Sequence, residues 1–205
     1  MTEVTTLTEV PLPTGGEGSR SVGWWGVLSL VASEAALFSY LLFSYFFVAI
    51  NADTQWPPTG APELGLVSVN TVILLSTSGT LWLAERQLSG GYRRSSIALQ
   101  GLTIALGALF AGLQTVEWSN KDFSLSSHTY GSLFFTITGI HLAHVVVGLL
   151  VLCFLMLWTI LGYFDADHRR PLSIGSIYWH FVDVVWIFIF SSLYLSPHLG
   201  GLHGP

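Results

Sequence analysis

The sequence carries very little charge and a single cysteine. Lys, Arg, Asp and Glu together make up 9% of the 205 residues, whereas soluble domains carry about 25%. Too few charged side chains are present to cover a globule of this size, which excludes an ordinary soluble domain. Because Cys153 is the only cysteine, an internal disulfide and a metal site built from several cysteines are also excluded. The formal net charge of −5 gives no indication of a nucleic-acid partner.

Apolar sequence fills the chain instead: 51% of the residues are hydrophobic and the mean hydropathy is +0.62. Five apolar segments are near or above the roughly 20 residues that cross about 30 Å of hydrocarbon. They cover about residues 24–50, 64–82, 95–118, 130–163 and 173–195. These segments predict an all-α, polytopic membrane protein that is a bundle of five transmembrane helices. We expect one membrane domain over 23–196, between a flexible polar tail over 1–22 and a short exterior C-terminal tail over 197–205.

Basic residues fall almost entirely on one side of this arrangement. With five crossings, the N-terminal tail, the second-to-third loop and the fourth-to-fifth loop share a side. That side holds six arginines: Arg20, Arg86, Arg93, Arg94, Arg169 and Arg170. Lys121 alone falls on the other side. Short loops rich in Lys and Arg face the cytoplasm, so we predict a cytoplasmic N-terminus and a C-terminus on the outside.

A few ionisable side chains interrupt the apolar segments. They are Glu34, His141, His144, His180 and Asp183, with Glu117 at the edge of the third segment. A charge at mid-bilayer costs at least about 2.5 kcal/mol, so we expect these side chains to face protein, a partner or water. A rise of 1.5 Å per residue places Glu34 and Asp183 roughly 15 Å deep. We therefore expect Glu34 to be protonated, or hydrogen-bonded to Asp183, His180 or a lipid headgroup.

The residues by themselves leave several roles open for this polar set. His141 and His144 share a helix face, as do His180 and Asp183, because each pair is three residues apart. Paired imidazoles ligate metals, but a third ligand at a matching depth is not evident. Intramembrane carboxylates mark proton or ion paths, although two carboxylates do not make a chain across the bilayer. Binding of a lipid headgroup or partner subunit is a third role, and hydrogen bonds between helices are the interpretation favoured for the three histidines.

Three pairs of small residues spaced four apart bear on how the helices meet. They are Ser76 and Thr80, Gly101 and Ala105, and Ala108 and Gly112. Such pairs let two backbones approach closely, and they also arise by chance in apolar helices. We treat them as candidate contact sites between helices.

Several longer motifs occur together and in a fixed order. They include Ser33-Glu34, Trp56-Pro-Pro-Thr-Gly60, Glu117-Trp118, Gly139-Ile-His141-Leu-Ala-His144-Val145 and Tyr178-Trp-His180-Phe-Val-Asp183-Val-Val-Trp186. From about residue 22 onward, the chain resembles subunit III of haem–copper terminal oxidases. The Tyr178–Trp186 segment matches the last-helix motif of that family. Several motifs in one order are more specific than any one of them.

The resemblance implies a non-catalytic accessory subunit that lies beside subunit I, with subunit II in the same complex. The complex would reduce oxygen to water and pump protons, with its haem and copper in the partner subunits. This chain would hold no catalytic, cofactor-binding or metal-binding residue. It would bind phospholipid and support proton uptake, with Glu34 at the position of the family's hallmark carboxylate. Five-helix members are typical of bacteria, which implies a multi-pass protein of the bacterial plasma membrane.

Other functions stay open alongside this one. A quinol oxidase subunit and a homologue associated with nitric-oxide reductase share the same motifs. Seven-helix members of the subunit III family carry two further helices before the one that matches the Glu34 segment. In those members the two helices form one wall of the lipid cleft. A stand-alone proton-coupled transporter belongs to a different class. Transporters usually show paired repeats and broken helices at the bilayer midplane, and this sequence shows neither.

Overall fold

The computed structural model describes residues 22–53, 55–164 and 170–199, and this part of the chain is helical throughout its regular structure. The helices are α1 (Val22–Ile50), α2 (Gly65–Ser89), α3 (Arg93–Ser119), α4 (Thr129–Leu161) and α5 (Arg170–Ile189). Five described helices are long and apolar enough to cross a membrane, which confirms the predicted all-α fold with five spans. The predicted tail over 1–22 lies outside the described residues, except that Val22 begins α1. Residues 200–205 of the predicted C-terminal tail also lie outside them.

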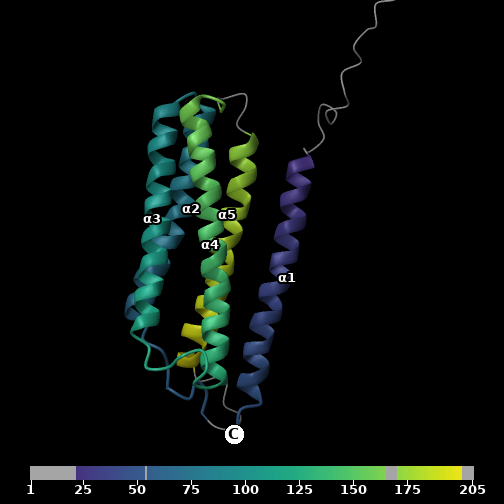
Figure 1. Ribbon diagram of the computed structural model, residues 1–205, viewed down its shortest axis with the longest axis vertical. Coiled ribbons are helices and arrows are strands. Elements are labelled where there is room, and N and C mark those ends of the chain that lie inside the picture. The colour runs from purple at the N-terminus through teal and green to yellow at the C-terminus, as the bar shows by residue number, and fades with distance from the viewer. Residues whose placement is uncertain (1–21, 54, 165–169, 200–205) are drawn as a thin grey trace, which may run out of the picture.

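Helices α2 to α5 form an elongated bundle, and α1 stands at its side (Figure 1). Helix α1 packs mainly against α5 and α4. Its buried residues, Phe38, Tyr45 and Ala49, all lie in its second half, and its first half diverges from the bundle (Figure 1). The chain alternates direction from helix to helix, as five crossings require. One end of the molecule holds the beginnings of α1, α3 and α5 and the ends of α2 and α4 (Figure 1).

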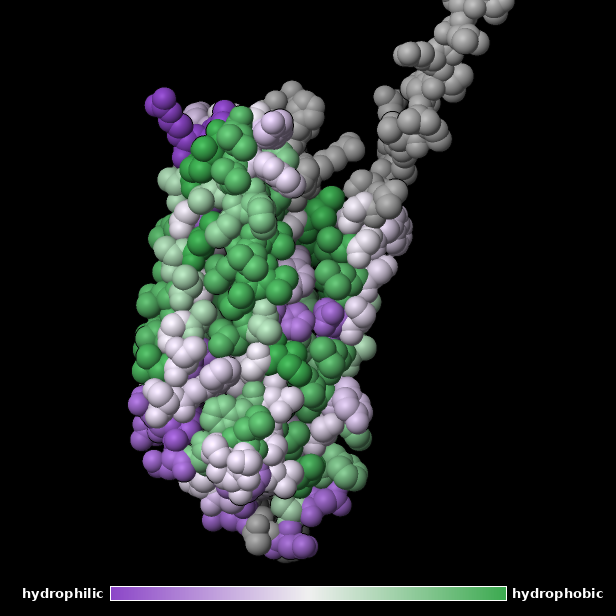
Figure 2. All heavy atoms as spheres, in the orientation of Figure 1, coloured by the Kyte–Doolittle hydropathy of each residue, from purple (hydrophilic) through white to green (hydrophobic). Residues whose placement is uncertain are grey.

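The outer surface has the character expected for contact with lipid. Hydrophobic residues cover the middle of the visible face, and hydrophilic residues gather toward its two ends (Figure 2). Large apolar side chains such as Phe43, Val72, Leu150 and Phe154 are exposed. In water such a surface would be unstable, whereas in a bilayer it is matched to the acyl chains.

A tryptophan fixes the packing of four helices at the bundle centre. Trp179 of α5 is fully buried and lies against Gly107 of α3 and Gly148 of α4. A Cβ added to Gly107 would lie 2.9 Å from Cη2 of Trp179, and one added to Gly148 would lie 2.8 Å from its Cε3. The indole N–H donates to the Thr77 hydroxyl of α2 at 2.8 Å. One side chain therefore joins four helices.

Most members of the small-residue pairs expected at helix contacts lie on the exposed surface of the bundle. Ala105, Ala108 and Gly112 are exposed, and a Cβ added to Gly112 would have no atom within 4 Å. The Ala108–Gly112 pair was therefore wrong as a contact site, because four-residue spacing does not reveal which way a helix face points. In the Gly101–Ala105 pair, a Cβ added to Gly101 would lie 3.9 Å from Sδ of Met156 on α4. Thr80 does meet a neighbouring helix, through a hydroxyl contact of 2.8 Å with Thr103 of α3.

At the ends of helices, side chains bind backbone groups that have no partner within the helix. The Arg93 guanidinium, at the beginning of α3, donates through Nε to the Thr159 carbonyl of α4 at 2.6 Å and also donates to the Ile160 carbonyl. These carbonyls lie in the last turn of α4, where intrahelical donors are missing and a cation is favoured. At the other end of α4, Nδ1 of His128 accepts the N–H of Gly131 at 2.9 Å.

The sequence pattern predicted that the last crossing ends near residue 195, but in the structure it continues beyond that residue. After α5, the backbone continues as a π-helical turn over Phe190–Leu195 and a 3-10 turn over Ser196–Leu199. Pro197 lacks an N–H, and in an α-helix its ring would clash with the carbonyl four residues earlier. The backbone has already left the α form before this proline, and the π turn buries Tyr194.

Candidate functional site

The predicted polar residues form three separate sites and one isolated side chain. In the first site, Nε2 of His144 on α4 lies 3.0 Å from Oε2 of Glu34 on α1. The two side chains are 17% and 23% exposed, so the pair is partly open to its surroundings. The expectation that Glu34 would bond to Asp183 or His180 was wrong. Equal depth was estimated by counting residues, and a residue count does not reveal which neighbour a helix face meets.

The protons of the Glu34–His144 pair can be counted from its contacts. Nδ1 of His144 lies 2.7 Å from the Ile140 carbonyl, and a carbonyl can only accept, so Nδ1 carries a hydrogen. The contact between Nε2 and the Glu34 oxygen then requires one proton between the two atoms. If Glu34 holds it, both groups are neutral, and if His144 holds it, a carboxylate faces an imidazolium. The pair has a net charge of zero in both cases.

This pair lies between α1 and the bundle, at the level where α1 begins to diverge. Figure 2 shows hydrophilic residues about halfway along the groove that separates α1 from the other helices. No residue from Gly23 to Leu37 of α1 is buried, whereas Phe38 is. The Phe38 ring lies 5.1 Å from the His144 ring, measured between centroids. Phe38 thus packs directly against the pair, and the groove opens from there toward the beginning of α1.

The second site joins α2 and α5. His180 and Asp183 share a helix face, as their spacing predicted, and both contact Ser78 of α2. The Ser78 hydroxyl lies 2.8 Å from Nδ1 of His180 and is hydrogen-bonded to Oδ2 of Asp183. Asp183 is 2% exposed. Sequence reasoning missed Ser78. Hydroxyl side chains at positions 76, 77, 78 and 80 stand out in an otherwise apolar segment, but the sequence does not show which of them faces α5.

The third site lies at the opposite end of the bundle from the diverging end of α1. Glu117 accepts hydrogen bonds from Gln114 at 2.8 Å and from the hydroxyl of Tyr194 at 2.9 Å. Its other oxygen lies 3.0 Å from Nζ of Lys121. The ammonium also lies 5.5 Å from the centroid of the Phe134 ring. Oε2 of Glu117 thus accepts two hydrogen bonds. Oε1 has no hydrogen-bond partner among the described residues and forms an ion pair with Lys121, the only lysine in the sequence.

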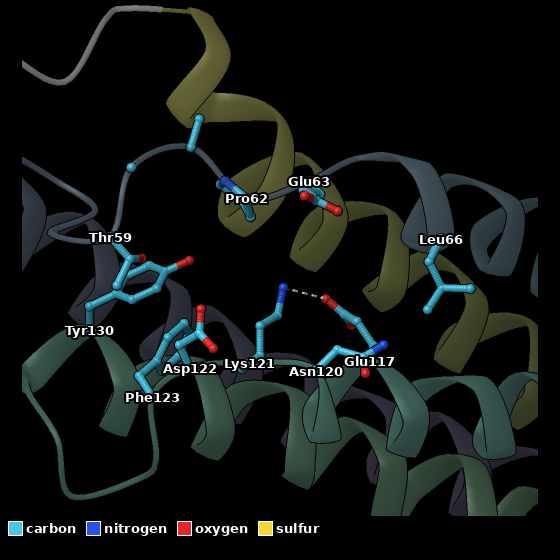
Figure 3. A pocket seen from close by; sticks show the side chains of 12 residues that line it. Thr59, Pro62, Glu63, Leu66, Glu117, Asn120, Lys121, Asp122, Phe123 and Tyr130 are labelled. Atoms are coloured by element: carbon cyan, nitrogen blue, oxygen red, sulfur yellow. Dashed lines mark ion pairs between the residues drawn. The ribbon is translucent and has the colours of Figure 1, made fainter.

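A cavity of about 370 Å³ adjoins the Glu117–Lys121 pair (Figure 3). Its walls come from the loop between α1 and α2 and from the end of α3, with Glu63 and Asp122 beside Lys121. Three carboxyl groups, those of Glu63, Glu117 and Asp122, line the cavity against the single ammonium group of Lys121, so acidic side chains predominate along its wall. The pair itself closes the end of the bundle where α3, α4 and the π turn meet.

His141 is the isolated side chain. It is 1% exposed and lies among the rings of Phe38, Phe110 and Trp186, with 5.0 Å between its centroid and that of Trp186. Neither ring nitrogen has a hydrogen-bond partner among the described residues. The hydrogen bonds between helices that the sequence favoured for all three histidines are therefore wrong for His141. His141 and His144 therefore share a helix face without sharing a site. Within the described ranges, no three His, Cys, Asp or Glu side chains are grouped to hold a metal ion.

Comparison with known proteins places the whole membrane domain in one family. Residues 19–197 match the family model described as Cytochrome c oxidase subunit III. Cytochrome c oxidase subunit 3 of Coturnix japonica is 34% identical over 189 residues, which cover 89% of this chain and 71% of the relative. The protein of that name from Neurospora crassa is 37% identical over 177 residues, covering 82% and 65%. The one from Danio rerio is 34% identical over 177 residues, covering 83% and 68%.

Five membrane-spanning helices that hold acidic and imidazole side chains between them define a polytopic integral membrane protein. The family match extends over all five of these helices. The chain belongs to the cytochrome c oxidase subunit III family of the haem–copper oxidases. This confirms the resemblance seen in the sequence motifs.

Proposed function

We propose that the chain is a non-catalytic accessory subunit of a haem–copper terminal oxidase. In this proposal it packs beside subunit I, with subunit II in the same complex, and the partner subunits hold the haem and copper. The observation that carries the proposal is the family match over residues 19–197. The matched relatives are named as subunits of cytochrome c oxidase, which favours that oxidase over a quinol oxidase. We place the chain in a membrane as a multi-pass subunit, because its five described helices are long and apolar enough to cross one.

The Glu34–His144 pair supports a role in proton uptake. In this proposal its two members exchange one proton over 3.0 Å, and the exchange leaves no net charge in the apolar region. Both side chains are partly exposed, so the pair can also exchange that proton with water or with a neighbouring group. A proton held at this point lies between α1 and the bundle, at a position that is partly exposed.

The groove between α1 and the bundle supports the binding of phospholipid. The first half of α1 is exposed and largely apolar, and the groove beside it opens toward the end that holds Arg86, Arg93 and Arg94. In the orientation predicted from these arginines, this is the cytoplasmic leaflet. Acyl chains match the apolar walls, and the Glu34–His144 pair supplies hydrogen-bonding groups where the groove closes near Phe38. Such a lipid would occupy space that α1 leaves open.

Purification of the tagged chain in a mild detergent tests the proposal. We expect the chain to bring down subunits I and II, together with the optical spectrum of haem. Deletion of the gene should leave a complex of subunits I and II with an unchanged haem spectrum and measurable initial turnover, because the redox centres are in those subunits. Turnover should then decay faster than in the complete complex.

Two outcomes would contradict the proposal. The first is recovery of the tagged chain alone and without haem absorbance, under conditions that preserve the pairing of subunits I and II. The second is an immediate and complete loss of oxygen reduction in a deletion complex that retains its haem spectrum. A tag on subunit II is the matched control, since it reports the same complex independently of this chain.

A further inference from the structure

The contact between α2 and α5 contains a carboxyl group with too few hydrogen-bond donors to be an anion. Asp183 is 2% exposed, and its Oδ1 has no partner among the described residues. Its Oδ2 contacts Ser78 and lies 3.5 Å from the hydroxyl of Thr77. An ionised carboxylate has about four acceptor positions and no hydrogen to donate, so its partners must all be donors.

Thr77 does not supply a donor to this carboxyl group. Its single hydroxyl hydrogen is directed to the Leu74 carbonyl at 2.5 Å. The same oxygen accepts the indole N–H of Trp179 at 2.8 Å. The 3.5 Å contact with Asp183 is therefore not a donated hydrogen bond. Ser78 is left as the one described side chain that could donate to Asp183, and an anion there would have a single partner.

Nearby charges do not stabilise an anion at this position either. Helix α5 packs mainly against α1, α2 and α4. Ionisable groups on these helices and on α5 include Glu34, Glu85, Arg86, His141, His144, Tyr178 and His180. Glu34 and His144 bind each other, and the hydroxyl of Ser173 donates to Glu85. The Arg86 guanidinium lies over the Trp82 ring, 5.6 Å from its centroid.

His180 is the remaining source of positive charge, and it reaches Asp183 through Ser78. A hydroxyl group donates one hydrogen bond and accepts others. The two contacts of Ser78 can therefore run in one of two directions. Either His180 Nδ1–H donates to Ser78, which donates to Asp183, or a protonated Asp183 donates to Ser78, which donates to a bare Nδ1 of His180.

We propose that Asp183, Ser78 and His180 form a proton-binding site between α2 and α5, in which Asp183 is the protonated carboxylic acid at neutral pH. Asp183 donates to Ser78 Oγ, Ser78 donates to His180 Nδ1, and the neutral His180 carries its own hydrogen on Nε2. In this arrangement the carboxyl hydrogen of Asp183 and the hydroxyl hydrogen of Ser78 each have an acceptor. It also removes an isolated charge from the apolar interior.

The bound proton can leave through His180. The O–H bond of Asp183 breaks as a new O–H bond forms on Ser78, and the original Ser78 O–H bond breaks as an N–H bond forms at His180 Nδ1. The products are a carboxylate and an imidazolium, and no other reactant is needed. His180 is only partly buried, so it is the end that exchanges with the surroundings, and Asp183 is the end that stores the proton. The site shares no residue with the Glu34–His144 pair and does not depend on the proposed function.

Infrared spectroscopy of the full chain in detergent tests the protonation of Asp183. A Glu34→Gln background removes the carboxyl group that contacts His144. We expect the carbonyl stretch of a protonated carboxylic acid at neutral pH, and we expect Asp183→Asn to abolish it. Ser78→Ala should shift this band to higher wavenumber, because the acid loses its acceptor, and Ser78→Thr should restore it. Ser76→Ala is the matched control, since Ser76 is exposed and bonds within its own helix.

Nitrogen NMR of the wild-type chain with labelled histidine provides a second measurement that needs no destabilising variant. The His180 signals are assigned by their loss in His180→Gln. We expect a bare Nδ1 and a protonated Nε2 at neutral pH. The proposal is overturned if Nδ1 carries a hydrogen at neutral pH. It is also overturned if Asp183→Asn removes a carboxylate band in place of an acid band, or if Ser78→Ala leaves the acid band unmoved.

Discussion

At the level of single residues, Glu34 and His144 meet across two helices with one proton between them. Nδ1 of His144 is already bound to the Ile140 carbonyl, so Nε2 is the atom that responds to a change at position 34. A glutamine there can donate its amide N–H to Nε2 and keep the pair neutral. An alanine leaves Nε2 without its partner. The two substitutions therefore separate the hydrogen bond from the exchange of a proton.

We expect Glu34→Gln to preserve assembly and to shorten the working lifetime of the oxidase or slow its proton uptake. Glu34→Ala should show the same functional loss and should also weaken assembly by about 0.6–1.7 kcal/mol, the range for hydrogen bonds between membrane helices. Turnover, its decay with time, and the midpoint of heat-induced loss of the subunit measure these effects. Ser33→Ala is the control, because Ser33 is exposed and bonds within α1. Wild-type turnover and lifetime in the glutamine variant would show that Glu34 only holds two helices together.

The polar residues show what a sequence reveals about single side chains inside a membrane. The free-energy cost of a charge inside the bilayer predicted that Glu34, His144, His180 and Asp183 would face protein, a partner or water. All four have polar contacts between helices. Their partners were harder to predict, since these depend on how each helix is rotated about its axis. Ser78 was missed for a further reason. A hydroxyl group in an apolar helix can bond to its own backbone, as Ser76 does, so its presence alone does not indicate a contact.

At the level of helices, close packing at Trp179 depends on two glycines from different helices. Gly107 of α3 and Gly148 of α4 both lack the Cβ atom that would meet the indole ring. The ring itself is fixed by its hydrogen bond to Thr77 and by burial on all sides. A larger residue at either glycine would have to move the tryptophan or separate the helices. These glycines therefore set the distance between α3, α4 and α5.

We expect Gly148→Ala to destabilise the folded chain by about 1–3 kcal/mol, which is the usual cost of overpacking a well-packed interior. The added Cβ would lie 2.8 Å from Cε3 of Trp179 and 3.4 Å from Cε1 of Tyr178. Gly112→Ala is the matched control, because its Cβ would meet no atom within 4 Å. The midpoint of thermal unfolding in mild detergent measures both. Equal midpoints for the two variants would contradict this account of the packing.

The helices themselves could be predicted from the sequence, but their contacts could not. Long apolar runs indicate a membrane-spanning helix whatever its neighbours are, and all five predicted segments are helical in the structure. Helix α2 continues to Ser89, beyond the expected end near residue 82, because a helix can extend past the hydrocarbon into the polar interface. Small residues four apart were sought within one helix. The close approach at Trp179 instead combines single glycines from two helices, a pattern that a one-dimensional spacing does not show.

On the scale of the whole molecule, the distribution of charge gives the fold a direction. The described arginines Arg86, Arg93 and Arg94 lie where α2 ends and α3 begins, and α1 begins at that same end of the bundle (Figure 1). Arg93 is bound to carbonyls of α4, so it is part of the fold as well as of the charge pattern. At the other end, Lys121 is turned inward and paired with Glu117. Little free positive charge is therefore left there to oppose the arginines.

This asymmetry predicts that the end with the arginines faces the cytoplasm, and labelling of single cysteines tests it. In a Cys153→Ala background, a cysteine replaces either Ser126, in the loop between α3 and α4, or Tyr92, in the loop between α2 and α3. Both side chains are exposed, so differences in labelling reflect the side of the membrane. We expect a membrane-impermeant thiol reagent to modify Ser126→Cys in intact cells and to modify Tyr92→Cys only after the membrane is opened. The reverse pattern would mean that the orientation in the membrane is opposite to the one that the arginines predict.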